Sequence, residues 1–439
     1  MGFLRGLSIA MGANLIVFVL SFFNNKLMYV SLSKEDNGLF FLIMRLSLFI
    51  PLFFGEWLRL SSLNVAGRDK QNIPVLSANG MWYSIFIGLV LICASLSFPS
   101  FLSGDFLGIP LHYLPVPVLV GCIFIARNNW QSLLLVNHKM ISYGLTYVLW
   151  SLLFLVLNVL FLVFLNFKLR HVITSFIIAT IICTLWAFFS NMIHNGHTFR
   201  PSLEILKISG KIGLRAWMAS LGMFLMTDIY VFMIRPLIGT KEMGYVMLAI
   251  FSICYRIYIL FQRVFDVVGT VLYSHVVQED VKTSHKMTML VTRNSLLVSI
   301  LLILIGVIFG KILIIIISDS TYLSAYIPML IMLPGIIAIN VGSVINSFFW
   351  GRNYPLRTIV APYIAALLGF VFNILFIPRI GVAGATLSFS LMSIIWFIFL
   401  TIYFIKDSGF KVYDVLVPCR ADFIYMISRI NHLLSGRRK

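Results

Sequence analysis

Charged side chains are scarce in this sequence. Only 11% of its 439 residues are Asp, Glu, Lys or Arg, whereas 60% are hydrophobic. Soluble domains carry about 25% charged and about 45–50% apolar residues. A fold surrounded by water cannot cover this much apolar surface, so much of it must face lipid. The composition therefore excludes an ordinary soluble domain and predicts an all-α polytopic membrane protein.

Acidic residues are the rarest charged group. The chain has 15 Asp and Glu against 33 Lys and Arg, for a formal net charge of +18. A soluble domain this basic would suggest nucleic acid. Here the basic residues lie mostly in short segments between apolar runs and in the C-terminal tail. We therefore expect membrane lipids, and no nucleic acid, as partners.

Patterns that support catalysis or metal binding are also missing. Five cysteines occur without a C-x-x-C pair, and four lie in apolar runs, which argues against metal and disulfide roles. The sequence has no D-x-D motif, and its single H-x4-D match, His275 to Asp280, lies in a polar segment. A membrane-embedded polysaccharide polymerase would need positioned acids, bases or metal ligands. We predict no cofactor, no metal and no enzymatic activity, and loss of some activity in His275→Ala would revive the enzyme alternative.

Long apolar runs dominate what is present. A spanning helix needs roughly 20 mostly apolar residues. The N-terminal run resembles a signal peptide but continues too far, so we expect it to be an uncleaved first helix. The sequence predicts twelve spans, over residues 7–29, 37–57, 75–98, 111–136, 143–166, 172–194, 211–236, 243–268, 292–317, 325–350, 356–377 and 383–405.

Basic residues near the span ends predict the orientation. If the N-terminus is inside, about 22 Lys and Arg lie on the inner side and about seven on the outer side. This bias predicts that both termini are cytoplasmic.

Two similar turns indicate an internal repeat. SKEDNGLFFLIMR (Ser33–Arg45) follows the first predicted helix, and TKEMGYVML (Thr240–Leu248) follows the seventh. These positions divide twelve helices into two halves of six with the same direction, a known transporter plan. Coincidence is the alternative, because Lys, Glu and Gly are common in turns. We predict six-helix lobes at 1–200 and 201–406, followed by a basic amphipathic cytoplasmic tail at 407–439.

Ionisable groups inside spans are costly and usually face a cavity or a partner. Six such residues lie well inside the predicted spans of this chain, and five of them are basic, which predicts a cationic cavity and an anionic cargo; the arginine fork suits phosphate oxygens. Arg45 and Arg256 each follow a repeated turn, and we predict that they bind substrate together with Arg127 and Lys26. The alternatives are structural pairing for Arg45 and Arg256 and extension to the membrane interface for Arg127. Lys311 could instead mark the outer end of a shorter span. For Asp228 we predict an ion pair or a role in ion coupling. The six are Lys26, Arg45, Arg127, Asp228, Arg256 and Lys311.

Three segments carry a resemblance to a known family. NILFIPRIGVAGATLS (Asn373–Ser388) resembles the N-x4-P-R-x-G-x2-G-A segment of polysaccharide-repeat flippases, which export O-antigen and capsule units and belong to the MATE/MurJ-like (MOP) superfamily. TDIYVFMIRPLIGTKEMGYV (Thr227–Val246) resembles the family's Asp-bearing seventh helix, and RNNWQSLLLVNHKMISYG (Arg127–Gly144) its exit from helix four. We interpret Pro378 as ending the eleventh helix, Gly381 as easing a turn, and Ala383–Ala385 as a close-packing site.

The resemblance implies a function. It implies a flippase that moves an undecaprenyl-diphosphate-linked oligosaccharide, for O-antigen of lipopolysaccharide or for capsule, across the bacterial inner membrane. The two lobes would alternate access to the cationic central cavity, with other polysaccharide-assembly proteins as further partners. A peptidoglycan lipid-precursor flippase and a MATE-type exporter are the alternatives; the latter would favour acidic cavity residues.

Overall fold

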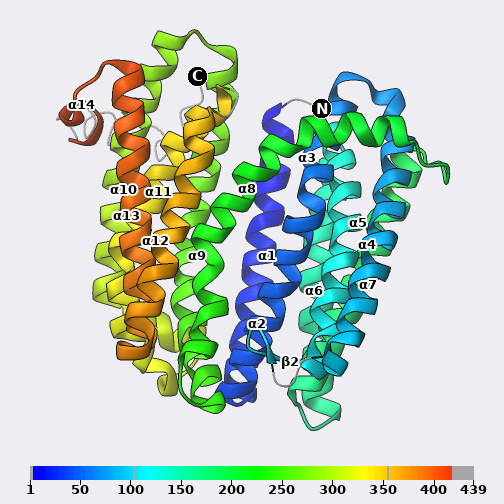
Figure 1. The fold of residues 1–439 in the computed structure, drawn as a ribbon, viewed down its shortest axis with the longest axis vertical. Coiled ribbons are helices and arrows are strands. Elements are labelled where there is room, and N and C mark those ends of the chain that lie inside the picture. Colours follow the sequence, from blue (N-terminus) through cyan, green and yellow to red (C-terminus); the bar gives the residue numbers. More distant parts are fainter. Residues whose placement is uncertain (1–2, 102–104, 353–354, 418–439) are drawn as a thin grey trace. The chain divides into compact units, whose positions relative to one another are not determined.

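The computed structural model describes residues 3–101, 105–352 and 355–417, and these residues are almost entirely helical (Figure 1). A short hairpin pairs β1 (Asp105–Phe106) with β2 (Ile109–Pro110). The α-helices are α1 (Phe3–Ser31), α2 (Lys34–Ile50), α3 (Glu56–Arg68), α4 (Ile73–Phe101), α5 (Pro115–Val136), α6 (Met140–Phe164), α7 (Leu169–Asn195), α8 (Leu203–Leu237), α9 (Lys241–Gln278), α10 (Val281–Ile317), α11 (Tyr326–Gly351), α12 (Leu356–Ile380), α13 (Val382–Ser408) and α14 (Val412–Leu416). The shorter helical segments are η1 (Pro51–Gly55), η2 (Lys70–Asn72), η3 (Leu111–Tyr113) and η4 (Ser320–Ala325).

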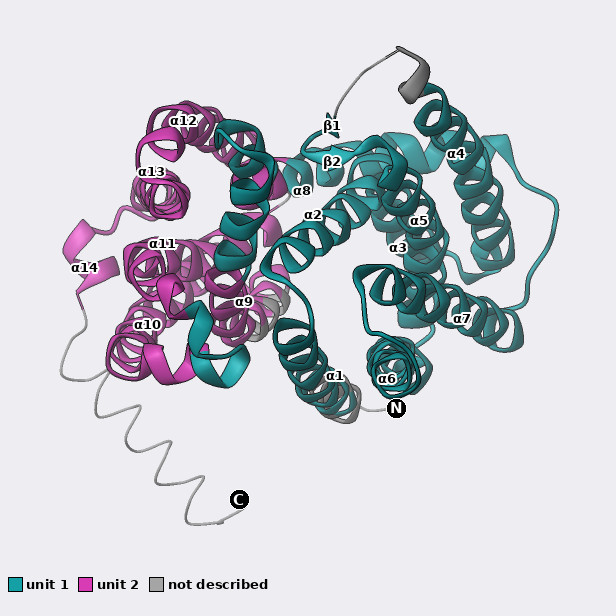
Figure 2. Ribbon diagram, turned by 90° about the horizontal axis from the view of Figure 1, so that it is seen from below, with its two compact units in different colours: residues 1–221, 231–252, 315–322 teal, residues 222–230, 253–314, 323–439 magenta. Residues whose placement is uncertain are grey.

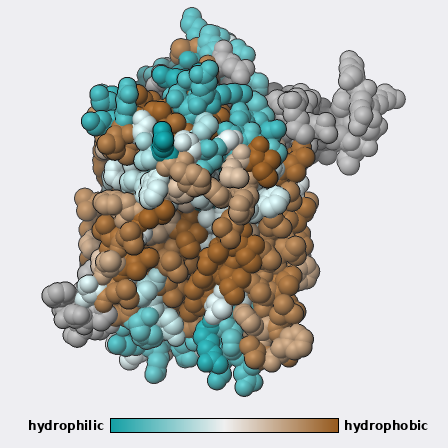
Figure 3. Space-filling view, turned by 90° about the vertical axis from the view of Figure 1, so that its right-hand side faces the viewer, coloured by the Kyte–Doolittle hydropathy of each residue, from teal (hydrophilic) through white to brown (hydrophobic). Residues whose placement is uncertain are grey.

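Within the described residues, twelve helical stretches are long and apolar enough to cross a membrane. This confirms the predicted fold class. On the face drawn in Figure 3, hydrophobic side chains form a broad band with hydrophilic groups at either end. That distribution is the one expected where lipid tails surround the middle of the helices and water meets their ends.

Several helices run well beyond the predicted apolar cores. The seventh was predicted over 211–236, but α8 spans Leu203–Leu237; the ninth was predicted over 292–317, but α10 spans Val281–Ile317. The extra turns mix polar and charged residues with apolar ones, so a search for continuous apolar runs misses them. Ser202 starts α8 by accepting a hydrogen bond from the backbone N–H of Ile205 at 3.4 Å, a typical N-cap interaction.

A π-helical turn interrupts the second span at Pro51. The turn covers Pro51–Gly55 and joins α2 to α3. Proline lacks the N–H needed by the regular helical ladder, so the backbone pattern must change there. Carbonyls in the turn accept hydrogen bonds from aromatic side chains: Trp217 Nε1 donates to the carbonyls of Leu52 (3.1 Å) and Phe53 (2.9 Å).

The chain forms two compact units, coloured separately in Figure 2. Unit 1 comprises Met1–Leu221, Val231–Ser252 and Ile315–Tyr322, and unit 2 comprises Gly222–Tyr230, Ile253–Ile314 and Leu323–Lys439. In unit 1, α5 packs on α2, α3, α4 and α7, while α6 packs on α1 and α7. In unit 2, α13 packs on α11 and α12. The lobes predicted at 1–200 and 201–406 divide the helices by their order along the chain, whereas the two units divide the chain by packing. The two-lobe division stays a prediction.

The segment with the family-like motif behaves partly as predicted. Pro378 does not end the helix: α12 continues to Ile380, because a proline in the last turn removes one hydrogen bond without blocking the next residues. The helix ends at Gly381, whose φ of 59° suits glycine. A Cβ on Gly384 would lie 2.5 Å from the Phe376 carbonyl, which confirms the close-packing site between α13 and α12.

The described chain ends shortly after α13. Gly409 adopts left-handed geometry after Ser408, and α14 follows. The predicted amphipathic pattern of the tail, at Phe423, Ile427, Ile430 and Leu434, lies outside the described residues.

Candidate functional site

The two repeated turns each start a helix. Lys34 begins α2 and Lys241 begins α9. The Ser33 hydroxyl caps α2 by accepting from the Asp36 N–H at 3.1 Å. The turns also meet in space, since a Cβ on Gly38 would lie 2.7 Å from the carbonyl carbon of Tyr245 and closer still to its oxygen. The sequence indicated that these turns are similar, but it did not indicate this contact within unit 1.

Lys26 and Lys34 bind main-chain carbonyls. The Lys26 ammonium donates to the carbonyl of Ile315 at 2.7 Å and to that of Ser318, at the C-terminal end of α10. Lys34 donates to the Thr321 carbonyl at 2.8 Å. Unpaired carbonyls at a helix C-terminus carry partial negative charge and favour a cation. These contacts give Lys26 a structural role, and its predicted part in substrate binding remains a prediction.

Arg45 and Arg127 belong to different helices of unit 1. Arg45 is half-buried on α2, with its guanidinium carbon 5.4 Å from the centre of the Phe41 ring. Arg127 on α5 is only 8% exposed and lies 4.0 Å from the centre of the Phe124 ring. A cation over an aromatic face is stabilised by the ring quadrupole. The side chain of Arg127 is therefore enclosed by the helices packed around α5 rather than extended to the membrane surface.

Unit 2 contains the predicted Asp228 and Arg256. Asp228 on α8 is 4% exposed. Its carboxylate accepts from the Thr227 hydroxyl at 2.9 Å and from the Tyr255 hydroxyl at 3.2 Å. Arg256 follows Tyr255 on α9 and is half-buried. Two hydroxyl donors thus hold the carboxylate, and its predicted role, an ion pair or ion coupling, stays a prediction.

A second charged group appears in the structure that no sequence pattern predicted. Arg235 at the end of α8 forms an ion pair with Asp105 of the hairpin, and the Lys241 ammonium lies 3.6 Å from the same carboxylate. The Tyr245 hydroxyl donates to the Gly108 carbonyl at 2.8 Å. In the sequence, Asp105 is marked only by its place after a glycine and before the span predicted at 111–136. That position does not indicate a partner 130 residues further along the chain. This group ties the hairpin to α8 and α9 within unit 1.

The predicted residues thus fall into two sets. Unit 1 holds Lys26, Arg45 and Arg127, and unit 2 holds Asp228 and Arg256. In the part of the chain that the structure describes, no group of His, Cys, Asp and Glu is arranged to hold a metal ion. The notable side chains are guanidinium and ammonium groups in apolar helices, which can bind anions.

Comparison with solved structures decides the fold. An inward-facing multidrug resistance MATE family transporter of the MOP superfamily superposes with a TM-score of 0.72, at 16% identity, covering 92% of this chain and 98% of that one. The lipid II flippase MurJ in an inward closed conformation gives 0.71, at 16% identity, covering 98% and 93%. The chain has the fold of MOP superfamily transporters. A MOP superfamily transporter from Pyrococcus furiosus, described as having a binding pocket of reverse polarity, gives 0.60 at 16% identity, covering 92% and 94%. No family model and no curated protein matches the chain.

Proposed function

We propose that this MOP-fold protein is a flippase for an undecaprenyl-diphosphate-linked oligosaccharide, the repeat unit of O-antigen or capsule. In this proposal it works in the bacterial inner membrane with both termini in the cytoplasm. The diphosphate binds basic side chains in the helices while the polyprenyl chain stays in lipid. No covalent chemistry is required of the protein.

The main support for this proposal is that the charged side chains inside the predicted spans are mostly positive. Among the six ionisable residues that lie well inside the predicted spans, Asp228 is the only acid, while Glu56 and Asp266 lie near span ends. A group that binds a diphosphate must compensate its negative charge, and arginine does so with a planar fork of N–H donors. Arg45 and Arg256 are half-buried rather than enclosed, so they are the better candidates for cargo contact; Arg127 is almost fully buried.

The fold supports a role in transport, and the positive charge of the in-span side chains favours one kind of cargo over another. MOP-fold structures include proteins named as multidrug transporters and as a lipid II flippase. For the Pyrococcus furiosus transporter, the reverse polarity of the binding pocket suggests a different function of that protein. A basic interior favours an anionic lipid-linked cargo over cationic drugs. The family-like segment around Pro378 favours an oligosaccharide repeat unit over a peptidoglycan precursor.

Genetic complementation tests the proposal. A strain that lacks its own repeat-unit flippase would receive the wild-type gene or the variants Arg45→Ala, Arg256→Ala and Arg45→Lys, with surface polysaccharide and membrane expression both measured. Lys207→Ala is a matched control, because it also removes one positive charge but from an exposed site.

We expect the wild type and the Lys207 control to restore polymer, both alanine variants to lose most of it, and Arg45→Lys to restore part. The assigned cargo would be overturned if the wild type complements no strain that lacks a repeat-unit flippase but does complement a strain that lacks its peptidoglycan-precursor flippase. Full activity in both alanine variants would remove these arginines from the mechanism.

A further inference from the structure

A cavity in unit 2 contains none of the residues assigned to the cargo. It has a volume of about 500 Å³ and lies where α11 and α13 end and where α10 and α12 begin. Arg352, Arg357 and Lys406 line it, together with one carboxylate, Asp407. The charged lining therefore carries three positive charges and one negative charge.

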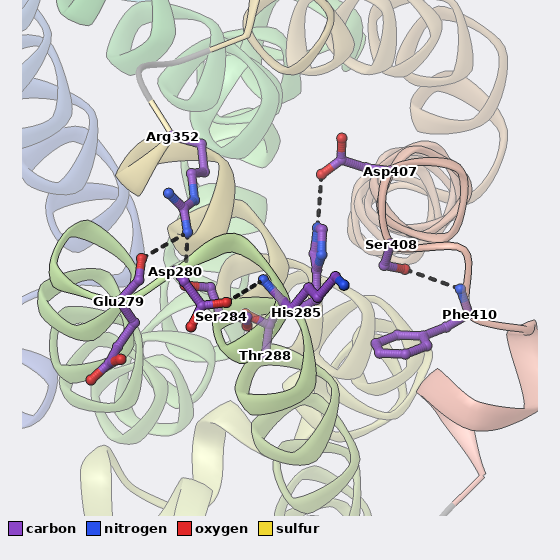
Figure 4. A network of polar contacts seen from close by, with 10 residues as sticks. Glu279, Asp280, Ser284, His285, Thr288, Arg352, Asp407, Ser408 and Phe410 are labelled. Carbon is purple, nitrogen blue, oxygen red and sulfur yellow. Dashed lines mark hydrogen bonds and ion pairs between the residues drawn. The ribbon is translucent and has the colours of Figure 1, made fainter.

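The carboxylate is already engaged by the protein. Asp407 Oδ2 lies 2.9 Å from Nε2 of His285, a buried side chain of α10 (Figure 4). An anion that enters the cavity would therefore meet the three cations, because the carboxylate of Asp407 is directed to the imidazole of His285. The lining is suited to negative charge.

Two of the three cations have defined contacts with the protein. Arg352 donates from Nη2 to the Ser284 hydroxyl at 2.8 Å and to the Glu279 carbonyl at 3.1 Å (Figure 4). The guanidinium carbon of Arg357 lies 5.8 Å from the centre of the Tyr403 ring. Within the described residues, neither Arg357 nor Lys406 forms an ion pair with a carboxylate, and both are exposed. The first turn of α12 adds the partial positive charge of a helix N-terminus.

An apolar face begins at the same cavity. On α12, Leu356, Val360, Ile364 and Leu367 are 70%, 42%, 38% and 66% exposed, and their spacing places them on one side of the helix. On the adjacent α13, Ile398 and Ile402 are 49% and 46% exposed, in the turns that precede Lys406. A ligand with both a phosphate and acyl chains fits this combination, whereas free phosphate would leave the apolar face unused.

We propose that this cavity binds the phosphate-bearing headgroup of an anionic phospholipid, from the leaflet that meets this end of the helices. The acyl chains lie along the exposed faces of α12 and α13. The chain's own C-terminal segment is a poor occupant, because Arg420, Arg429 and the last three residues make its sequence basic. The proposal is independent of the cargo, since the cavity includes neither Arg45 nor Arg256.

Native mass spectrometry of the full-length protein in detergent tests the site. The protein is titrated with phosphatidylglycerol or with phosphatidylcholine that has the same acyl chains. The test variant is Arg357→Gln/Lys406→Gln, which changes two exposed side chains and leaves the hydrogen bonds of Arg352 intact. The control, Lys311→Gln/Arg379→Gln, removes the same charge from exposed positions towards the opposite ends of α10 and α12.

We expect phosphatidylglycerol to bind the wild type and the control tightly, and the test variant about thirty-fold more weakly, as follows from the contribution of a basic residue near an anionic lipid surface. Phosphatidylcholine should bind all three equally weakly. Equal affinity of wild type and test variant, or an equal loss in the control, would overturn the site. Displacement of the lipid by inorganic phosphate at similar concentration would show a soluble-anion site instead and would overturn the lipid assignment.

Discussion

Gly38 packs directly against the backbone of Tyr245, joining the two turns that the sequence repeats. A methyl group on Gly38 would lie 2.7 Å from the Tyr245 carbonyl carbon, and the atoms it meets are main chain. A main-chain neighbour inside two packed helices cannot rotate away as a side chain can. The glycine at this position is therefore required by the approach of α2 to the start of α9.

Gly38→Ala should destabilise the protein. Overpacking of this kind costs about 1–3 kcal/mol and occasionally more. We expect a lower melting temperature for the detergent-purified variant, measured by intrinsic fluorescence or light scattering. Gly67→Ala is the control, because nothing lies within 4 Å of its added Cβ; it should be neutral or slightly stabilising. Equal melting temperatures for the two variants would show that α2 and α9 can separate without cost.

The ion pair of Asp105 with Arg235 should stabilise the protein much more than the ion pair of Asp105 with Lys241. The side chains of Asp105 and Arg235 are 9% and 13% exposed, whereas that of Lys241 is 69% exposed. Removal of one partner from a buried pair costs about 3–5 kcal/mol, while an exposed pair contributes about 0–1 kcal/mol. In a double-mutant cycle, Asp105→Asn should couple strongly to Arg235→Gln and weakly to Lys241→Gln. Comparable coupling energies, measured from stability, would contradict the geometry.

His197 should make stability depend on pH. It lies between α7 and α8, with Nδ1 2.9 Å from the Ser77 hydroxyl. Burial lowers the pKa of His197 below its usual 6.5. The folded state therefore binds the proton less readily than the unfolded state. The contribution of neutral His197 to the stability of the fold is present above pH 6.5 and is lost as the pH falls towards the folded-state pKa. A series of melting temperatures across the range from neutral to mildly acidic pH should fall less steeply in His197→Gln than in the wild type; identical slopes would remove His197 as the cause.

Trp217 should stabilise the π-helical turn through its indole N–H. Trp217→Phe keeps a large aromatic ring but removes the donor to the carbonyls of Leu52 and Phe53. The loss should lower the free energy of unfolding by about 0.5–1.5 kcal/mol, the net contribution of a typical hydrogen bond, because the two contacts are part-buried and exposed. Trp186→Phe, at a 39% exposed position on α7, should have little effect. A harmless Trp217→Phe would mean that other donors satisfy these carbonyls.

Much of the architecture could be predicted from composition and local pattern. Apolar runs predicted all twelve candidate spans, and the glycines at 381 and 384 predicted a tight turn and a close helix contact. These features depend on burial of apolar side chains and on backbone sterics over a few residues. The extent of α8 and α10 could not be predicted in the same way, because their first turns mix polar and charged residues with apolar ones and do not continue the apolar runs.

The sequence by itself determined that this chain spans a membrane, that its in-span charges are mostly basic, and which turns begin two of its helices. Only the tertiary structure decided which groups meet. Asp105 finds Arg235, Lys26 binds the carbonyls at the end of α10, and three cations line one cavity in unit 2 because helices distant in sequence pack side by side. Local propensities carry no information on such pairings, since the energy of a contact depends on the distance and burial that packing creates.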